Sequence, residues 1–100
     1  MTLYKYKIDY NSKLVCREEP GFEEKKKTFC RTCRYPRRVN KENIGKVENG
    51  FVYPELWLRE KDDEKAKTML REWYQKKMES DKREYEQTLL EYKNIIDGLN

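Results

Sequence analysis

Residues 3–10 alternate between apolar and polar side chains, in the pattern of a strand with one buried face. The two faces would carry Tyr4, Tyr6, Ile8 and Tyr10 on one side and Lys5, Lys7 and Asp9 on the other. A two-residue turn at Asn11-Ser12 then predicts a hairpin with a second strand over residues 14–17. We expect the tyrosine-rich face to form part of the core.

Turn-forming residues divide the next segment into short elements. Pro20-Gly21 is typical of a type II turn, in which glycine supplies the positive φ, and it ends the second strand. A third strand is expected over residues 27–33, with an irregularity at Pro36. Asn40 is placed to cap a single helical turn that runs through Asn43.

The strongest hairpin signal is Asn49-Gly50, which lies between two apolar segments. It predicts a two-residue turn followed by a strand over residues 51–53. Pro54 breaks that strand or places it at a sheet edge, ahead of the apolar residues 56–58. Residues 1–58 therefore predict an antiparallel β-sheet of four to five strands.

Residues 59–100 have the composition of one long helix, because they contain no proline and a single glycine, Gly98, which suits a C-cap. Asp62 or Asp63 is placed to cap the helix start. Four pairs of opposite charge at i,i+4 would add modest support: Asp63–Lys67, Glu72–Lys76, Glu79–Arg83 and Lys82–Glu86. The predicted fold class is α+β, a single domain with a sheet region over 1–58 and a helix over 59–100.

The helix carries two apolar stripes. The first, which we expect to pack on the sheet, comprises Ala66, Met69, Leu70, Trp73 and Tyr74. The second follows a heptad spacing and is called the helix seam below: Met78, Tyr85, Leu89, Tyr92, Ile96 and Leu99. Either the helix is continuous and its seam pairs with another chain in a homodimer, or Ser80-Asp81 caps a second helix that folds back. The lack of a helix stop near Ser80 favours the continuous helix.

Composition narrows the possible functions. Charged residues make up 42% of the chain, and the aliphatic core is thin, but aromatic content and a net charge of only +4 argue against disorder. The absence of histidine excludes Ser-His-Asp and Cys-His catalysis. We find no Gly-rich phosphate loop, no paired carboxylates suited to catalysis and no membrane-spanning run. We therefore expect a non-enzymatic cytoplasmic protein without a cofactor or a membrane partner.

The three cysteines include one Cys-x-x-Cys spacing, Cys30 to Cys33. Such spacing allows both thiols to reach one metal ion, but a structural zinc site needs four ligands and only Cys16 remains. On a regular strand the two side chains would also point to opposite faces. Cys30 and Cys33 are therefore weak metal candidates, and ordinary packed thiols are favoured in a reducing compartment.

The most distinctive charge feature is the window from Lys25 to Lys41, which holds eight cationic residues and no acidic one. We call it the basic segment. Its candidate contacts for a phosphate, a nucleotide or an acidic protein surface are Arg31, Arg34, Tyr35, Arg37, Arg38 and Lys41. The alternative is internal neutralisation by acidic residues that lie just before the segment: Glu18, Glu19, Glu23 and Glu24.

Three segments, residues 3–6, 38–47 and 62–66, resemble small uncharacterised proteins encoded by phages and prophages of Gram-positive bacteria. The resemblance implies a short accessory protein that acts in the bacterial cytoplasm. Many such proteins antagonise host defence by occupying a surface, anti-CRISPR proteins among them. The implied partner is a host protein such as a defence nuclease or nucleoprotein. The alternative function is a nucleic-acid- or nucleotide-binding module centred on the basic segment.

Overall fold

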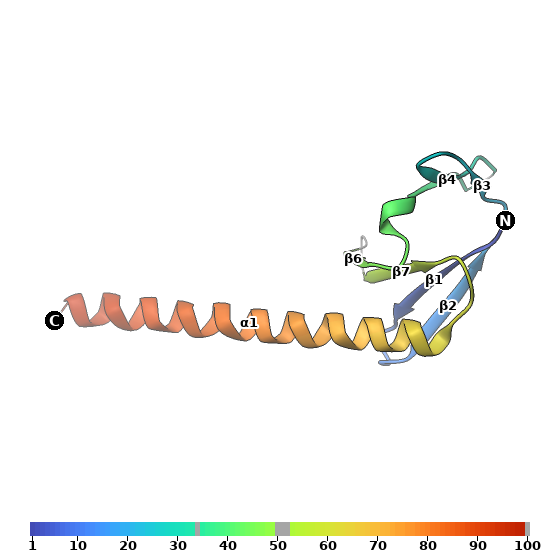
Figure 1. The fold of residues 1–100 in the computed structure, drawn as a ribbon. Coiled ribbons are helices and arrows are strands. Elements are labelled where there is room, and N and C mark those ends of the chain that lie inside the picture. Colours follow the sequence, from blue (N-terminus) through green and yellow to red (C-terminus); the bar gives the residue numbers. More distant parts are fainter. Residues whose placement is uncertain (34, 50–52, 100) are drawn as a thin grey trace. The chain divides into compact units, whose positions relative to one another are not determined.

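The computed structural model describes residues 1–33, 35–49 and 53–99. The described chain contains seven strands, a short 3-10 helix and one long α-helix (Figure 1), so the α+β prediction is confirmed. The elements are β1 (Leu3–Ile8), β2 (Leu14–Glu19), β3 (Glu23–Glu24), β4 (Thr28–Arg31), β5 (Arg37–Asn40), η1 (Lys41–Asn43), β6 (Val47–Asn49), β7 (Pro54–Leu58) and α1 (Asp63–Leu99).

The chain forms two compact units, Met1–Leu70 and Arg71–Asn100. The division falls inside α1, so the first unit contains all the described strands and the start of the helix. The last strand ends at Leu58, and a short connection leads to the helix start at Asp63.

The strands form two antiparallel sheets rather than the single one predicted. The larger sheet has the order β2-β1-β7-β6, and the smaller one has the order β3-β4-β5. Strands β3 and β5 were not predicted, because β3 has two residues and β5 exposes three of its four side chains. Neither strand shows the alternation that signals a half-buried strand.

Strand β1 lies inside the larger sheet and contributes to a core on each of its faces. Leu3 packs in one cluster with Trp57 of β7 and with residues of the smaller sheet and its connections: Phe22, Phe29 and Val39. Tyr6 points to the other face and packs with Leu56, Leu58, Ala66 and Leu70. The larger sheet is therefore covered on both faces, by the smaller sheet and by the start of α1 (Figure 1).

The predicted tyrosine face is confirmed at Tyr4 and Tyr6 and wrong at Tyr10, which is 85% exposed. The reason is a hairpin one residue longer than predicted. Asp9 and Lys13 share a backbone hydrogen bond, and Ser12 adopts a left-handed conformation with φ 62°. The Asp9 carboxylate also accepts from the backbone N–H groups of Asn11 and Lys13. This loop encloses three residues in place of the predicted two, and it turns Tyr10 out of the strand.

Two glycines occupy positions that require a left-handed backbone. Gly21 has φ +83°, which agrees with the predicted turn at Pro20-Gly21, and Gly45 has φ +80° just after η1. The short helical turn at 41–43 is confirmed, although the Asn40 side chain makes no capping hydrogen bond.

The predicted second hairpin differs at its described ends. Asn49 belongs to β6 rather than to the turn, because it pairs with Pro54, the first residue of β7. Positions 50–52 of the predicted turn and strand lie outside the described residues.

Helix α1 is continuous from Asp63 to Leu99, so the folded-back alternative is wrong. Asp62 caps its start through a hydrogen bond from the Lys65 N–H at 3.1 Å. Within the described helix, Lys77 and Asp81 form an i,i+4 salt bridge at 3.1 Å. In none of the four predicted pairs do the charged atoms of the described residues lie within 4 Å of each other. Gly98 lies inside the last turn and is not a left-handed cap. Among the described helical residues, no stretch is both long and apolar enough to cross a membrane.

Candidate functional site

The basic segment folds into β4, β5 and η1 of the smaller sheet. Arg31 and Arg37 stand opposite each other in the β4–β5 register, where two like charges would destabilise the pair of strands. Each arginine instead contacts its own carboxylate outside the segment. The repulsion between the two guanidinium groups is thereby offset within the Met1–Leu70 unit.

Arg31 is a structural residue rather than a free anion ligand. Its guanidinium donates to Glu19 at 2.6 Å and to the Tyr35 carbonyl at 3.0 Å, and it lies 5.0 Å from the Phe22 ring centroid. The Arg31 side chain is only 12% exposed, and the Glu19 side chain 13%. The planar guanidinium group of arginine suits these several contacts, and the Glu19 carboxylate already balances its charge.

The same pattern recurs at two further candidates. Arg37 pairs with Glu55 at 3.3 Å and lies over the Trp57 ring. Lys41 pairs with Glu24 at 3.3 Å and lies over the Phe29 ring, and Arg59 reaches the same carboxylate. The internal-neutralisation alternative is therefore supported at Glu19, Glu24 and Glu23, which pairs with Lys25 at 3.2 Å. The contribution of Glu55 was not predicted.

The remaining candidates lie on the surface or outside the described residues. Arg38 and Tyr35 are exposed, and Arg34 is not among the described residues. Arg38 forms no salt bridge within the described chain, and the same holds for Lys26, Lys27 and Lys46. These four are the cations that the smaller sheet and its neighbourhood leave available for a partner.

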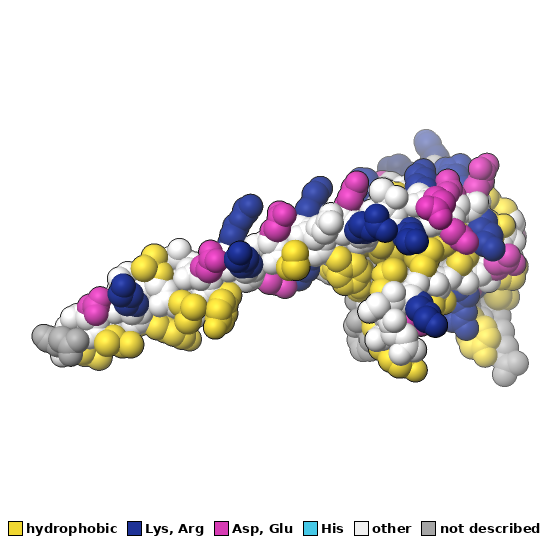
Figure 2. All heavy atoms as spheres, turned by 90° about the horizontal axis from the view of Figure 1, so that it is seen from below, with side chains coloured by type: hydrophobic (Ala, Val, Ile, Leu, Met, Phe, Trp, Pro, Cys, Tyr) yellow, Lys and Arg dark blue, Asp and Glu magenta, His cyan; other side chains and the backbone are white. Residues whose placement is uncertain are grey.

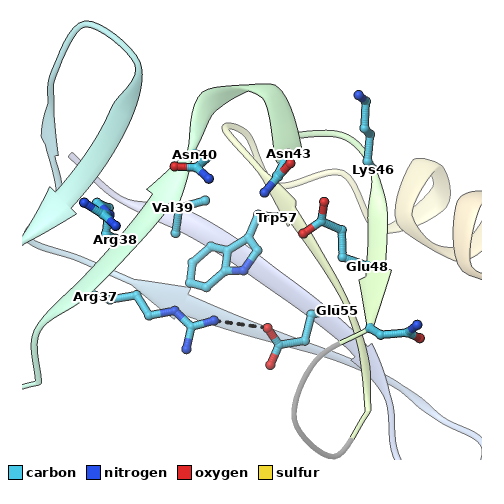
Figure 3. Close-up of a pocket in the computed structure, with 10 residues that line it drawn as sticks. Arg37, Arg38, Val39, Asn40, Asn43, Lys46, Glu48, Glu55 and Trp57 are labelled. Carbon is cyan, nitrogen blue, oxygen red and sulfur yellow. Dashed lines mark hydrogen bonds and ion pairs between the residues drawn. The ribbon is translucent and has the colours of Figure 1, made fainter.

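Two of these four cations, Arg38 and Lys46, line a hollow of about 330 Å³ between β5–η1 and β6–β7 (Figure 3). The Trp57 indole, 7% exposed, forms its floor, and the Arg37–Glu55 ion pair crosses one side. The remaining lining consists of Arg38, Val39, Asn40, Asn43, Lys46, Glu48 and Asn49. A second hollow of about 540 Å³ shares Asn40 and is lined by Lys26, Lys27, Lys41 and Glu42.

Most of the first hollow was missed at the sequence level. Arg37 and Arg38 were predicted as contact residues. Trp57 and Glu55 were not, because they belong to β7, which lies outside the basic segment in the sequence. Their proximity depends on the stacking of the smaller sheet on the larger one, which no local pattern indicates. The amides of Asn40 and Asn43 were expected near the short helical turn, and both line this hollow.

The cysteines do not form a recognisable metal centre. Cys30 is half-buried on β4, where its sulfur lies 3.3 Å from the Thr28 hydroxyl, and Cys33 is exposed beyond the end of that strand. Cys16 is half-buried on β2. In the part of the chain that the structure describes, no three Cys, Asp or Glu side chains gather as metal ligands do.

The Arg71–Asn100 unit presents the helix seam as an open apolar surface. Every seam residue is exposed, from 47% at Leu89 to 81% at Leu99. Figure 2 shows hydrophobic side chains mainly along one side of this part of the helix and charged side chains on the other. Such a surface on a charged helix is typical of a segment that pairs with another helix.

Comparison of the chain with protein-family models, with curated protein sequences and with solved structures finds no match.

Proposed function

We propose that the protein is a non-catalytic accessory protein that binds a host protein and inhibits it by occupying its surface. The contact surface that we assign to this role is the hollow around Trp57 and its rim. The observation that carries the proposal is the Arg37–Glu55 pair beside Trp57, with Arg38 and Lys46 exposed at the rim. Arginine and tryptophan are the side chains most enriched in the energetically dominant parts of protein interfaces.

The charge distribution favours a protein over a phosphate backbone as the partner. Cations and carboxylates are interleaved around the hollow, where Glu48 and Glu55 accompany Arg38 and Lys46. A phosphate backbone would meet repulsion from these carboxylates, whereas a protein surface can present both signs of charge. The resemblance to phage accessory proteins makes a bacterial defence component, a nuclease or a nucleoprotein in the cytoplasm, the partner that we propose.

The test is affinity capture from lysate of a Gram-positive bacterium with two matched double variants. R38E/K46E reverses the two available cations of the rim. K13E/K61E makes the same change in net charge at exposed positions outside the hollow. We expect the wild type and K13E/K61E to retain the same host protein and R38E/K46E to lose it. Equal retention by R38E/K46E would place the contact elsewhere and contradict the assignment.

A second candidate function, nucleic-acid or nucleotide binding, is favoured by the neighbouring hollow. Lys26, Lys27 and Lys41 line it with Asn40 and Glu42, and Glu24 pairs with Lys41. Binding through several phosphate contacts must weaken steeply as salt is added. We expect a labelled single-stranded oligonucleotide to bind at low salt and to be released by K26E/K27E. Lack of binding at low salt removes this candidate.

A further inference from the structure

The residues of the helix seam follow one another at alternating spacings of four and three positions along α1. The pattern is complete only if Lys82, a polar residue, is included between Met78 and Tyr85. Numbered as a heptad, Met78, Tyr85, Tyr92 and Leu99 occupy one core position, conventionally d. The other core position, a, is occupied by Lys82, Leu89 and Ile96. All of them lie on the continuous helix α1, so one side of the helix presents them together. The charged residues at the neighbouring e and g positions then determine whether two such helices pair in parallel or antiparallel orientation.

A parallel pairing of two copies is opposed by charge. Equal positions face each other in a parallel coiled coil, so Lys82 would lie against Lys82 of the second copy within the seam. The flanking g and e positions would bring Asp81 against Glu86 of the second copy, and this like-charge contact would occur twice. The structure offers no internal partner for Glu86, whereas Asp81 pairs with Lys77 of its own helix within the described residues.

An antiparallel pairing reverses the sign of these contacts. When Leu89 faces Tyr92 of the second copy, Tyr85 faces Ile96, and every central layer is apolar. The flanking e positions then bring Glu86 against Lys93 of the second copy, and symmetry repeats this opposite-charge contact at the other end. Sliding one helix by a heptad in one direction would oppose Lys93 to Lys93. Sliding it in the other direction would add contacts between Glu79 and Lys93, but it would oppose Glu86 to Glu86 and place Lys82 against Tyr92 inside the paired segment. Charge and the apolar central layers together therefore favour a single antiparallel register.

The ends of the paired segment support the same arrangement. Lys82 faces Leu99 of the second copy, at the last helical residue. The last turn of α1 contains no basic residue, so its carbonyl groups and the negative end of the helix dipole lack a cation from their own turn. The second copy's Lys82 supplies that cation, and this accounts for a lysine in an otherwise apolar seam.

We propose that the helix seam binds a second copy of this chain, with the two helices antiparallel and Leu89 against Tyr92 at the centre. The proposal is independent of the hollow around Trp57, because its residues all belong to the Arg71–Asn100 unit.

The experiment reverses the two flanking charges separately, in the full-length chain, and measures the dimer dissociation constant by sedimentation equilibrium. In the antiparallel register E86K creates two Lys–Lys contacts and K93E creates two Glu–Glu contacts. Each single variant should therefore weaken dimerisation by roughly tenfold. An equimolar mixture of E86K and K93E restores both opposite-charge contacts and should recover the wild-type constant. Circular dichroism confirms that each variant keeps its helix.

The matched control is E91K, which makes the same charge change as E86K at an exposed position off the seam. It should leave the dissociation constant within about twofold of the wild type. A parallel dimer gives the opposite result for E86K, because the new lysine would face Asp81 and tighten the dimer, and this outcome would overturn the proposed orientation. A monomer mass for the wild type at roughly 100 µM would overturn the pairing itself.

Discussion

The hydroxyl of Tyr6 donates a hydrogen bond to Asp63 Oδ1 at 2.8 Å. The same hydroxyl accepts one from the Asp62 backbone N–H at 3.0 Å. Tyr6 belongs to β1 and is fully buried, while the two aspartates stand at the start of α1, more than 50 residues later. One tyrosine side chain therefore joins the centre of the larger sheet to the first turn of the helix, and it fixes where α1 begins on that sheet.

Replacing Tyr6 by phenylalanine removes both hydrogen bonds and little else. We expect Y6F to lower the free energy of unfolding by about 1–2 kcal/mol, since a contact at the helix start is lost while the ring stays buried. Urea denaturation measures the change. The control Y10F, at a residue that is 85% exposed, should shift the free energy of unfolding by less than about 0.5 kcal/mol. Equal effects of Y6F and Y10F would contradict this role of Tyr6.

Burial, and next the hydrogen bond to Asp63, raise the pKa of Tyr6 well above its ordinary value of 10.0. A pKa that is higher in the folded state means that the folded protein holds the phenolic proton more tightly than the unfolded chain. The resulting stabilisation is fully present below pH 10 and is lost as the pH rises towards the folded-state pKa. We expect the wild-type free energy of unfolding to fall by up to about 1.4 kcal/mol per pH unit more than that of Y6F above pH 10. Denaturation of both proteins between about pH 8 and 11 tests this difference, and parallel curves would contradict it.

The Arg31–Glu19 ion pair should matter more than the exposed pairs. We expect R31A to cost about 2 kcal/mol, because it leaves a largely buried Glu19 carboxylate and the Tyr35 carbonyl without their donor. R31K should recover only part of this loss, since lysine cannot reproduce the planar fork. The control K25A breaks the exposed Lys25–Glu23 pair and should cost less than about 0.5 kcal/mol. Thermal or urea unfolding of the three variants gives the order, and an R31A cost no larger than that of K25A would contradict the assignment.

Two glycines should respond in opposite ways to alanine. Gly45 has φ +80°, and a Cβ added there would meet no heavy atom within 4 Å, so G45A tests backbone strain alone and should destabilise by about 1 kcal/mol. Gly98 lies in the last turn of α1 with equally open surroundings, and G98A should increase helicity slightly. Urea denaturation and far-ultraviolet circular dichroism distinguish the two results. A neutral G45A would show that the turn tolerates another backbone conformation.

The sequence pattern predicted correctly those helices and turns that depend on interactions between residues close together in the chain. The start of α1 follows from Asp62 as a capping residue, and its continuity follows from the absence of proline after residue 59. The turn at Gly21 follows from the conformational freedom of glycine. In each case the determining interaction lies within a few residues along the chain.

The errors arose where distant segments meet. Leu3 stands on the polar side of the predicted strand, yet it is fully buried because the smaller sheet covers that face. The eight cations of the basic segment looked like an exposed patch, but Glu19, Glu24 and Glu55 neutralise several of them across the fold. The acidic residues just before the basic segment indicated that part of it could be neutralised in this way. The sequence around Glu55 gave no indication that Glu55 would pair with Arg37.

The two-faced burial of β1 also determines how the Met1–Leu70 unit can open. Leu3 and Tyr6 anchor two separate cores, so neither core can separate from the sheet without releasing the same strand. Amide protons of β1 should then exchange with solvent only when the whole unit unfolds, while those of the smaller sheet's edge strands exchange through local opening. Strand β7 contributes to the same two cores through Trp57 on one face and Leu56 on the other. These two neighbouring strands thus make the two layers behave as a single cooperative folding unit.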